Sequence, residues 1–198
     1  MKAVLMSIQP KWCELIASGK KTVEVRKTKP KLQTPFKVYI YCTKDNTFAE
    51  KTLRGFDDGG KAIYYKANKG KVIGEFVCDR IDEFSVPYPA YFSEIDSKTD
   101  SIIKSACLKP MEIHAYNGVH QTYGWHITDL VIYDEPRELG EFYTQCREYC
   151  KTGTVETPKK CYKCKYQYTW NLASKCRVDG KLTIKRPFQS WGYVEEVE

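Results

Sequence analysis

The sequence predicts an α+β domain built on a small, partly open, mixed β-barrel with flanking helices. Short runs rich in β-branched and aromatic residues alternate with only a few helical segments. The chain has 198 residues, of which 42% are hydrophobic, which is enough for one well-filled core. We therefore expect residues 1–198 to form a single domain, with a cysteine-rich insertion at about residues 146–182.

Local signals define the first elements. Residues 2–8 are a short apolar run that predicts a strand. Pro10 suits the first turn of a helix, which residues 11–18 continue. Gly19 is expected to end this helix, because glycine readily takes the left-handed conformation found at helix C-termini. Residues 22–28 then alternate polar and apolar side chains and predict a second strand.

The remaining elements are predicted in the same way. Strands are predicted where β-branched and aromatic residues are enriched, and helices where apolar residues recur at helical spacing. The further predicted strands are residues 36–43, residues 71–84 with a bend at Gly74, residues 125–133 and residues 189–197. The further predicted helices are residues 92–108, 111–116 and 139–150. Residues 44–70 and 151–182 are predicted to be irregular, the former with a short helix near Phe48. In a closed barrel the last strand would pair with an early one.

The net charge of +7 is unevenly distributed. Residues 1–37 carry nine Lys/Arg and two Asp/Glu, and residues 151–190 carry ten and two, whereas the segment between them is acidic. If the two basic segments meet in space, they form a face suited to phosphates, and otherwise their lysines only aid solubility. No apolar run approaches the roughly 20 residues that span a membrane, and the N-terminus does not resemble a signal peptide. We expect a cytoplasmic protein.

The stretch GKKTVEVRK, residues 19–27, carries the main candidate site. Side chains alternate along a strand, so Thr22, Glu24 and Arg26 should share one face and the two valines the other. Lys20 and Lys21 stand at the mouth of this strand. Such a cluster suits a phosphate or a base edge, or acid–base catalysis. The alternative is an exposed strand face with a weak Glu–Arg ion pair.

The spacing Gly-x-Lys-x-x-Glu-x-Arg, at Gly19, Lys21, Glu24 and Arg26, resembles that of the ASCH domain, a member of the PUA-like group of β-barrel folds. The segments GWHITDLVIYDEPREL and IKRPFQSWGYVEE also resemble small ASCH proteins of bacteria and their phages. The resemblance covers most of the chain apart from the cysteine-rich region and residues 44–70.

The resemblance implies a role connected with RNA, in a cleft that the motif lines. Some small bacterial ASCH proteins are amidohydrolases that deacetylate acetylated cytidine, with a Lys that activates a nucleophilic Thr and a Glu that assists, and nuclease activity is also associated with the family. Lys21 matches that Lys. The position of the nucleophilic Thr holds Glu24 here, and Thr22 lies one pleat away. Lys21 and Glu24 are therefore the candidate catalytic residues if the protein is an enzyme.

Two further groups are candidates for ligand binding. Trp125 begins a predicted strand, where it would stack a base if it lies near the barrel mouth, or else belong to the core. A polar and aromatic group precedes or begins the last strand: Arg186, Gln189, Ser190 and Trp191.

The nine cysteines divide into two sets. Four are isolated in apolar stretches and suit a core. Five crowd into the insertion: Cys146, Cys150, Cys161, Cys164 and Cys176. In a cytosolic chain this CxxxC…CxxC…C pattern favours zinc over disulfides, with Cys161 and Cys164 as the surest ligands. Four thiolates leave no open position, so the zinc would be structural, and it would order a loop that has little core of its own.

Three functions therefore remain open. The first is RNA or nucleotide binding in a basic cleft at the motif. The second is a hydrolase that acts on a modified nucleoside or on RNA. The third is a protein-interaction module that uses the zinc loop, with a partner that the sequence does not identify.

The cysteine pattern predicts about one zinc ion per chain, bound by four of the five clustered thiols. Elemental analysis of purified protein should find this zinc, and a strong chelator should remove it. Protein that contains no metal before chelation would contradict the prediction.

Overall fold

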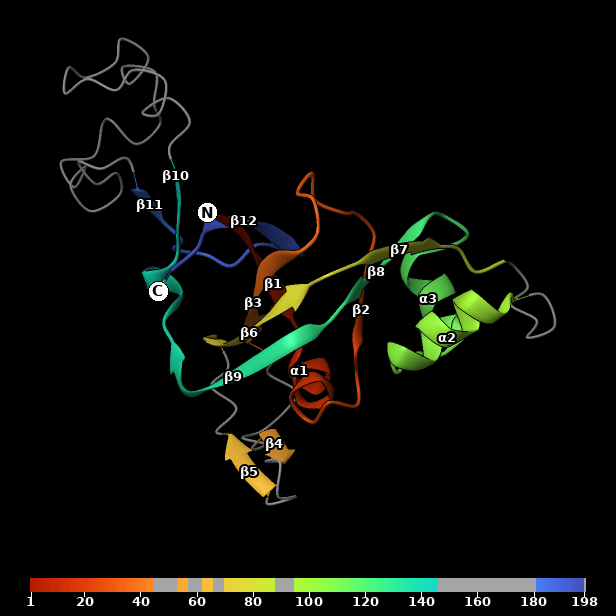
Figure 1. Cartoon of the computed structure of the whole chain (residues 1–198), viewed down its shortest axis with the longest axis horizontal. Coiled ribbons are helices and arrows are strands. Elements are labelled where there is room, and N and C mark those ends of the chain that lie inside the picture. The colour runs from red at the N-terminus through yellow and green to blue at the C-terminus, as the bar shows by residue number, and fades with distance from the viewer. Residues whose placement is uncertain (45–52, 57–61, 66–69, 88–94, 146–180, 198) are drawn as a thin grey trace, which may run out of the picture.

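The computed structural model describes residues 1–44, 53–56, 62–65, 70–87, 95–145 and 181–197 (Figure 1). The five clustered cysteines lie outside the described residues, and so does the zinc loop that they were predicted to form. The same holds for the helix predicted near Phe48. Within the described ranges no group of His, Cys, Asp and Glu is placed to hold a metal ion. In the same ranges, no helix combines the length and apolarity needed to cross a membrane.

The centre of the fold is a five-stranded mixed sheet in the order β12-β1-β3-β6-β9. Its strands are β1 Lys2–Ile8, β3 Phe36–Cys42, β6 Val72–Cys78, β9 Thr128–Arg137 and β12 Trp191–Glu195. β1 and β3 are parallel, whereas the other neighbours are antiparallel. Parallel neighbours need a crossover, which α1 (Pro10–Ala17) and β2 (Val23–Arg26) supply.

Both faces of the central sheet are covered, which explains why β1 is a continuous apolar run rather than an alternating one. Val4 and Met6 point into a core that α1 completes with Cys13 and Ile16. The intervening residues of β1 face a second core that includes Tyr39 and Phe142. The helical and strand signals at the N-terminus are therefore confirmed.

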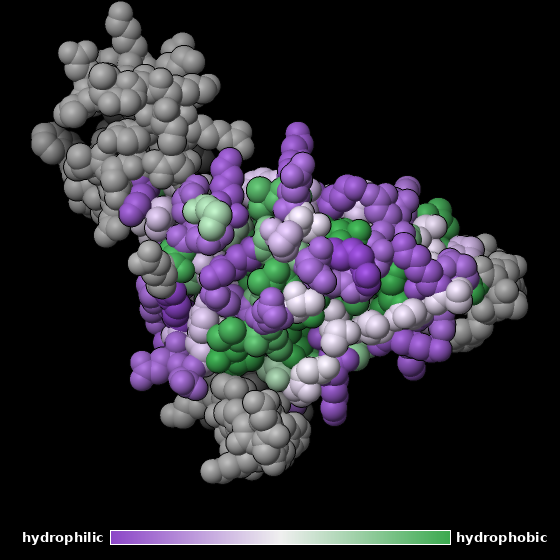
Figure 2. Space-filling view, viewed as in Figure 1, coloured by the Kyte–Doolittle hydropathy of each residue, from purple (hydrophilic) through white to green (hydrophobic). Residues whose placement is uncertain are grey.

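A second sheet of three strands, in the order β2-β8-β7, carries the other two helices. β7 is Ile81–Phe84 and β8 is Thr122–His126. α2 (Ser97–Ser105) and α3 (Pro110–Asn117) lie together beside this sheet, on the opposite side of the molecule from β10 and β11 (Figure 1). Their Ile102, Ile103 and Ile113 pack against Val23 and Val25 of β2. The face of the molecule in this view is mostly hydrophilic, with hydrophobic residues showing between the polar ones (Figure 2).

Two predicted strands are each divided between the two sheets. The run 71–84 breaks at residues 79–80, so that β6 belongs to the five-stranded sheet and β7 to the three-stranded one. The run 125–133 breaks in the same way at Ile127, between β8 and β9. At both corners the chain stays extended while its hydrogen-bonding partner changes, and residue composition carries no signal for that change.

Gly74 marks a close approach rather than the end of a strand. The pairing of β6 with β9 shifts register beside it. A Cβ atom at Gly74 would lie 2.3 Å from the carbonyl oxygen of Val131, so only glycine lets the two strands come this close. The bend predicted at this position corresponds to this irregular pairing.

The described residues form mixed sheets with helices beside them, and no closed barrel is seen among them, so the predicted partly open β-barrel is supported only as an α+β fold. β9 and β12 form the two edges of the five-stranded sheet, and the remaining strands make separate sheets. The mixed character of the sheet and the helices beside it are as predicted. The pairing of the last strand with an early one is also confirmed, because β12 runs antiparallel to β1, with Lys2 opposite Glu195.

Three further predictions need correction. The helix predicted from residue 139 is a 3-10 turn, Leu139–Glu141, followed by strand β10, Tyr143–Gln145. Leu139 and Phe142 have helical spacing, yet both pack into the second core. β10 pairs with β11, Lys181–Thr183, which begins in a region predicted to be irregular. In the predicted loop at 44–70, β4 (Leu53–Phe56) pairs with β5 (Ala62–Tyr65).

Candidate functional site

The end of α1 determines where Lys21 lies. Gly19 has a φ of +69°, the left-handed conformation expected at this position. The chain then turns back beneath the helix, and the backbone N–H of Lys21 donates to the carbonyl of Leu15 at 2.9 Å. This turn carries the Lys21 side chain inward, where it is 2% exposed.

Strand β2 sorts its side chains as the alternation predicts. Val23 and Val25 face the core formed with α2 and α3, and Glu24 and Arg26 face the other side. Thr22, however, precedes the strand and is exposed, so it does not share the polar face. Lys21 joins the polar face instead of Thr22. Strand alternation begins only at Val23, so it does not fix the direction of the side chains before that residue.

Lys21, Glu24 and Arg26 form a buried charged triad. The Glu24 carboxylate lies between the two cations, with Oε2 3.3 Å from Lys21 Nζ and Oε1 3.0 Å from an Arg26 guanidinium nitrogen. All three side chains are less than 10% exposed. Burying charges is costly unless they are paired and hydrogen-bonded, and each member of the triad has such partners.

Backbone carbonyls from distant segments complete the partners of the two cations. Lys21 Nζ donates to the carbonyl of Ala106 at 2.7 Å. Arg26 donates to the carbonyl of Ser7 at 2.8 Å and to the hydroxyl of Ser190 at 3.2 Å. The triad therefore connects β1, the end of α2 and the segment before β12.

The triad lines a cavity of about 500 Å³. β1 and α1 contribute Ser7 and Trp12 to its wall, α3 contributes Glu112 and Tyr116, and the segment before β12 contributes Gln189 and Ser190. Such a volume lies in the usual range of small-ligand sites. The polar face of β2 is therefore part of the wall of a partly open pocket, and its charges are buried rather than the exposed ion pair of the alternative interpretation.

The charged side chains that line the cavity balance, since Lys21 and Arg26 oppose Glu24 and Glu112, but the two cations are buried N–H donors that suit an electron-rich ligand. Two cations and one carboxylate leave the triad with a net charge of +1. Arg26 Nε is buried and has no hydrogen-bond partner within the described residues. Lys21 has two described partners for its three N–H donors. The site thus holds unused donors beside a positive charge.

The predicted ligand-binding residues divide into two groups. Lys21, Glu24, Arg26, Gln189 and Ser190 come together around the cavity, as the sequence suggested. The others do not line it: Lys20, Thr22, Arg186, Trp125 and Trp191.

Trp125 is a core residue and not a base-stacking residue at the mouth of a barrel. It is 0% exposed, and its ring lies 5.6 Å from that of Phe36 and 5.7 Å from that of Trp191. The alternation of side chains along β8 predicts that they point to two opposite faces of the sheet, but it does not predict which face is buried. Trp191 is partly buried and donates from its indole nitrogen to the hydroxyl of Thr28 at 3.1 Å.

Two aromatic residues of the cavity were not predicted from the sequence. Trp12 lies on α1, and its ring centroid is 5.0 Å from Lys21 Nζ. Tyr116 lies on α3 and is 41% exposed. Burial raises the pKa of the Tyr116 hydroxyl, so this group remains a hydrogen-bond donor at neutral pH. Tyr116 lies four residues after Glu112, so the two side chains share a helix face. This spacing was the one feature of the sequence that could have indicated Tyr116 as a cavity residue.

Comparison with known proteins identifies the family. The ASCH domain matches residues 6–173, which include the whole motif and continue into the cysteine-rich region. The chain belongs to the ASCH domain family. ASCH domains have a PUA-like fold and commonly bind RNA.

The search of solved structures returned ASCH proteins. The crystal structure of ASCH from Zymomonas mobilis has 20% sequence identity and a TM-score of 0.46, over 69% of this chain and 73% of that one. A point variant of the same Zymomonas mobilis protein gives 20% identity and a TM-score of 0.47, over 70% of this chain and 77% of that one. No curated protein matches the sequence.

Glu24 should be a stability determinant of this ASCH domain. Glu24→Gln leaves two buried cations without their carboxylate, and breaking a buried ion pair from one side costs about 3–5 kcal/mol. We expect the free energy of unfolding, measured by urea denaturation, to fall by about that amount.

A matched control is Glu83→Gln, whose carboxylate pairs with Lys29 where both side chains are about half exposed. This change should leave the denaturation midpoint unaltered, because exposed ion pairs contribute little. Equal effects of the two substitutions would mean that the triad is not the stabilising unit described here.

Proposed function

We propose that this ASCH domain binds RNA or a nucleotide in the cavity above the Lys21–Glu24–Arg26 triad. The observation that carries the proposal is the pair of buried cations, Lys21 and Arg26, among the residues that line the cavity. A phosphate oxygen or a base carbonyl is an acceptor that suits such donors.

The aromatic residues of the cavity support this ligand class. Trp12 and Tyr116 stand on the same wall as the charged groups, and bases stack on such rings at about 1–3 kcal/mol each. Gln189 is exposed and offers an amide that donates and accepts, as the edge of a base requires. A cavity of about 500 Å³ accommodates one nucleotide rather than a duplex, which favours single-stranded RNA.

Binding of a short fluorescent single-stranded RNA, followed by anisotropy, tests this proposal. Affinity should fall as salt rises, because phosphate contacts release counterions. Lys21→Ala and Arg26→Ala should weaken binding strongly. Tyr116→Leu should weaken it roughly tenfold by removing a stacking surface from a partly exposed position, where folding is preserved.

Lys37→Gln is the matched control for the loss of one positive charge, because Lys37 of β3 pairs with Glu75 of β6 and does not line the cavity. Its affinity should equal that of the wild type. Thermal unfolding of each variant confirms that only folded protein is compared. If Lys21→Ala, Arg26→Ala and Tyr116→Leu all bind RNA like the control, the binding site lies elsewhere.

A second candidate function is hydrolysis of a modified nucleoside, such as acetylated cytidine, or of RNA. It is favoured by one observation: an ammonium and a carboxylate, Lys21 and Glu24, lie 3.3 Å apart on the wall of the same cavity. Glu24 would accept a proton from an attacking water and Lys21 would stabilise the developing oxyanion. Thr22 is outside the cavity, so water and not this hydroxyl would be the nucleophile.

Turnover assays with acetylated cytidine and with short RNAs distinguish the enzyme from a binding module. If the protein is a hydrolase, Glu24→Gln should lower the rate per folded molecule by about 10²–10⁴-fold, the usual contribution of a general base. Wild-type protein that binds RNA but turns over neither substrate would leave binding as the function.

A further inference from the structure

A second polar cavity, of about 420 Å³, lies between α2 and the β7–β8 pair. Its wall carries six polar or charged side chains: Arg80, Asp82, Lys98, Ser101, Ser105 and His126. None of them lines the cavity above the triad. The two cavities therefore share no lining residue.

The helix α2 presents one polar face to this second cavity. Lys98, Ser101 and Ser105 are three and four residues apart, which places them on the same side of the helix. Neither serine hydroxyl has a hydrogen-bond partner within the described residues. Two hydroxyls and an ammonium thus face the same space.

The opposite wall comes from the three-stranded sheet. Asp82 is paired with Gly124 across the β7–β8 ladder, and His126 lies two residues farther along the same face. A Cβ at Gly124 would approach the Ile102 side chain to 3.0 Å, so α2 packs closely on the sheet at Gly124. The cavity lies beside His126.

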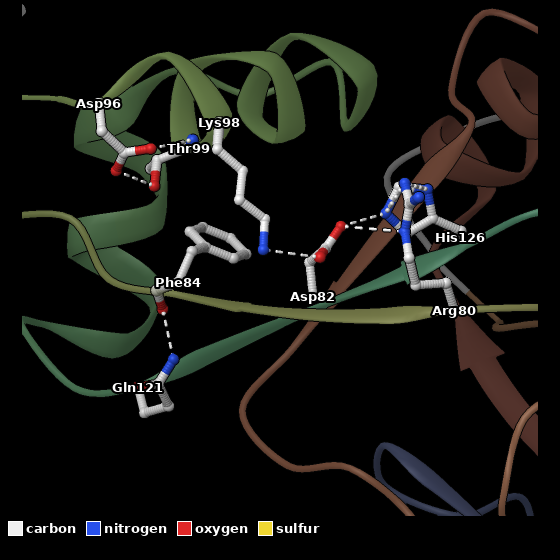
Figure 3. A network of polar contacts seen from close by, with 8 residues as sticks. All are labelled: Arg80, Asp82, Phe84, Asp96, Lys98, Thr99, Gln121 and His126. Atoms are coloured by element: carbon white, nitrogen blue, oxygen red, sulfur yellow. Dashed lines mark hydrogen bonds and ion pairs between the residues drawn. The ribbon is translucent and has the colours of Figure 1, made fainter.

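Asp82 holds three basic side chains around the cavity (Figure 3). Its carboxylate oxygens lie 2.9 Å from Lys98 Nζ, 2.7 Å from His126 Nε2 and 3.3 Å from Arg80 Nε. Burial alone would raise the pKa of Asp82, but hydrogen bonds from Lys98 and His126 outweigh it and lower the pKa, so the group is ionised. Figure 3 shows Lys98 reaching Asp82 from α2 while Arg80 and His126 approach it from the other side.

The cluster has more positive charge and more donors than its own acceptors use. Asp82 is 12% exposed, whereas Arg80 and Lys98 are 63% and 64% exposed. Arg80 and Lys98 against the single carboxylate of Asp82 give a net charge of +1, with His126 left out of the count. Arg80 also contacts the His126 ring through one Nη at 3.2 Å, but the guanidinium and the ammonium each retain further N–H groups, and the two serine hydroxyls add to them. Phosphate oxygens are acceptors that match such a set.

We propose that this cavity binds a phosphate group. The same chemistry is present in a free phosphate monoanion or dianion and in the phosphodiester of an RNA strand, and the experiment separates these sources. Arg80 supplies a planar pair of donors, Lys98 a point charge, and Ser101 and Ser105 neutral hydrogen bonds.

The full chain is titrated in phosphate-free buffer with inorganic phosphate, by calorimetry. A second titration uses a short single-stranded RNA that has no terminal phosphates, by fluorescence anisotropy. Lys98→Gln should weaken binding roughly tenfold in at least one titration, as expected for loss of a charge-assisted hydrogen bond. If Lys98→Gln weakens the binding of inorganic phosphate, the ligand is free phosphate. If it weakens the binding of RNA alone, the ligand is a phosphate of the RNA backbone.

Lys104→Gln is the matched control. Lys104 lies on the same helix, is also well exposed, and pairs with Asp100 outside the cavity. This variant should bind like the wild type in both titrations, and Arg80→Gln should behave like Lys98→Gln. The proposal is overturned if neither ligand binds, or if Lys98→Gln and Lys104→Gln give the same affinity in both titrations.

Discussion

The two ionic contacts of Glu24, with Lys21 and Arg26, are the constraint on which the rest of the structure depends. A carboxylate and two cations that are nearly excluded from water must find hydrogen-bond partners inside the protein. The cations find them on the backbone carbonyls of Ser7, in β1 of the five-stranded sheet, and of Ala106, at the end of α2. The triad therefore joins the five-stranded sheet to the end of α2, and the cavity forms at that junction.

The helix α2 links the two proposed binding sites. The hydroxyl-bearing residue Ser105 lines the second cavity, and its carbonyl accepts from the backbone N–H of Thr22. The next residue, Ala106, accepts from Lys21 of the first cavity. A ligand bound by Lys98 and Ser105 would thus contact α2 next to Ala106, whose carbonyl positions Lys21 in the first cavity.

The sequence predicts the local parts of this structure well. The helix stop at Gly19 and the alternation of Glu24 and Arg26 depend only on neighbouring residues, and both are found. The burial of Lys21 does not follow from its neighbours in the chain, because it depends on the carbonyl of Ala106, which is distant in sequence. The place of Tyr116 in the cavity was not predicted, because the pattern of polar and apolar residues in a helix does not show which part of the protein the helix packs against. The divided strands at residues 79–80 and at Ile127 could not be foreseen, because strand composition is the same before and after a change of sheet.

The position of β12 beside β1 has a consequence for how the protein is made. Ribosomes release the chain from its N-terminus, so β1 emerges first and β12 follows all the other described strands. Until then one edge of β1 has no hydrogen-bonding neighbour, and Arg26 lacks the contact with Ser190. An open edge of apolar residues is a site of aggregation. Nascent chains of this protein should therefore depend on chaperones until the last strand is synthesised.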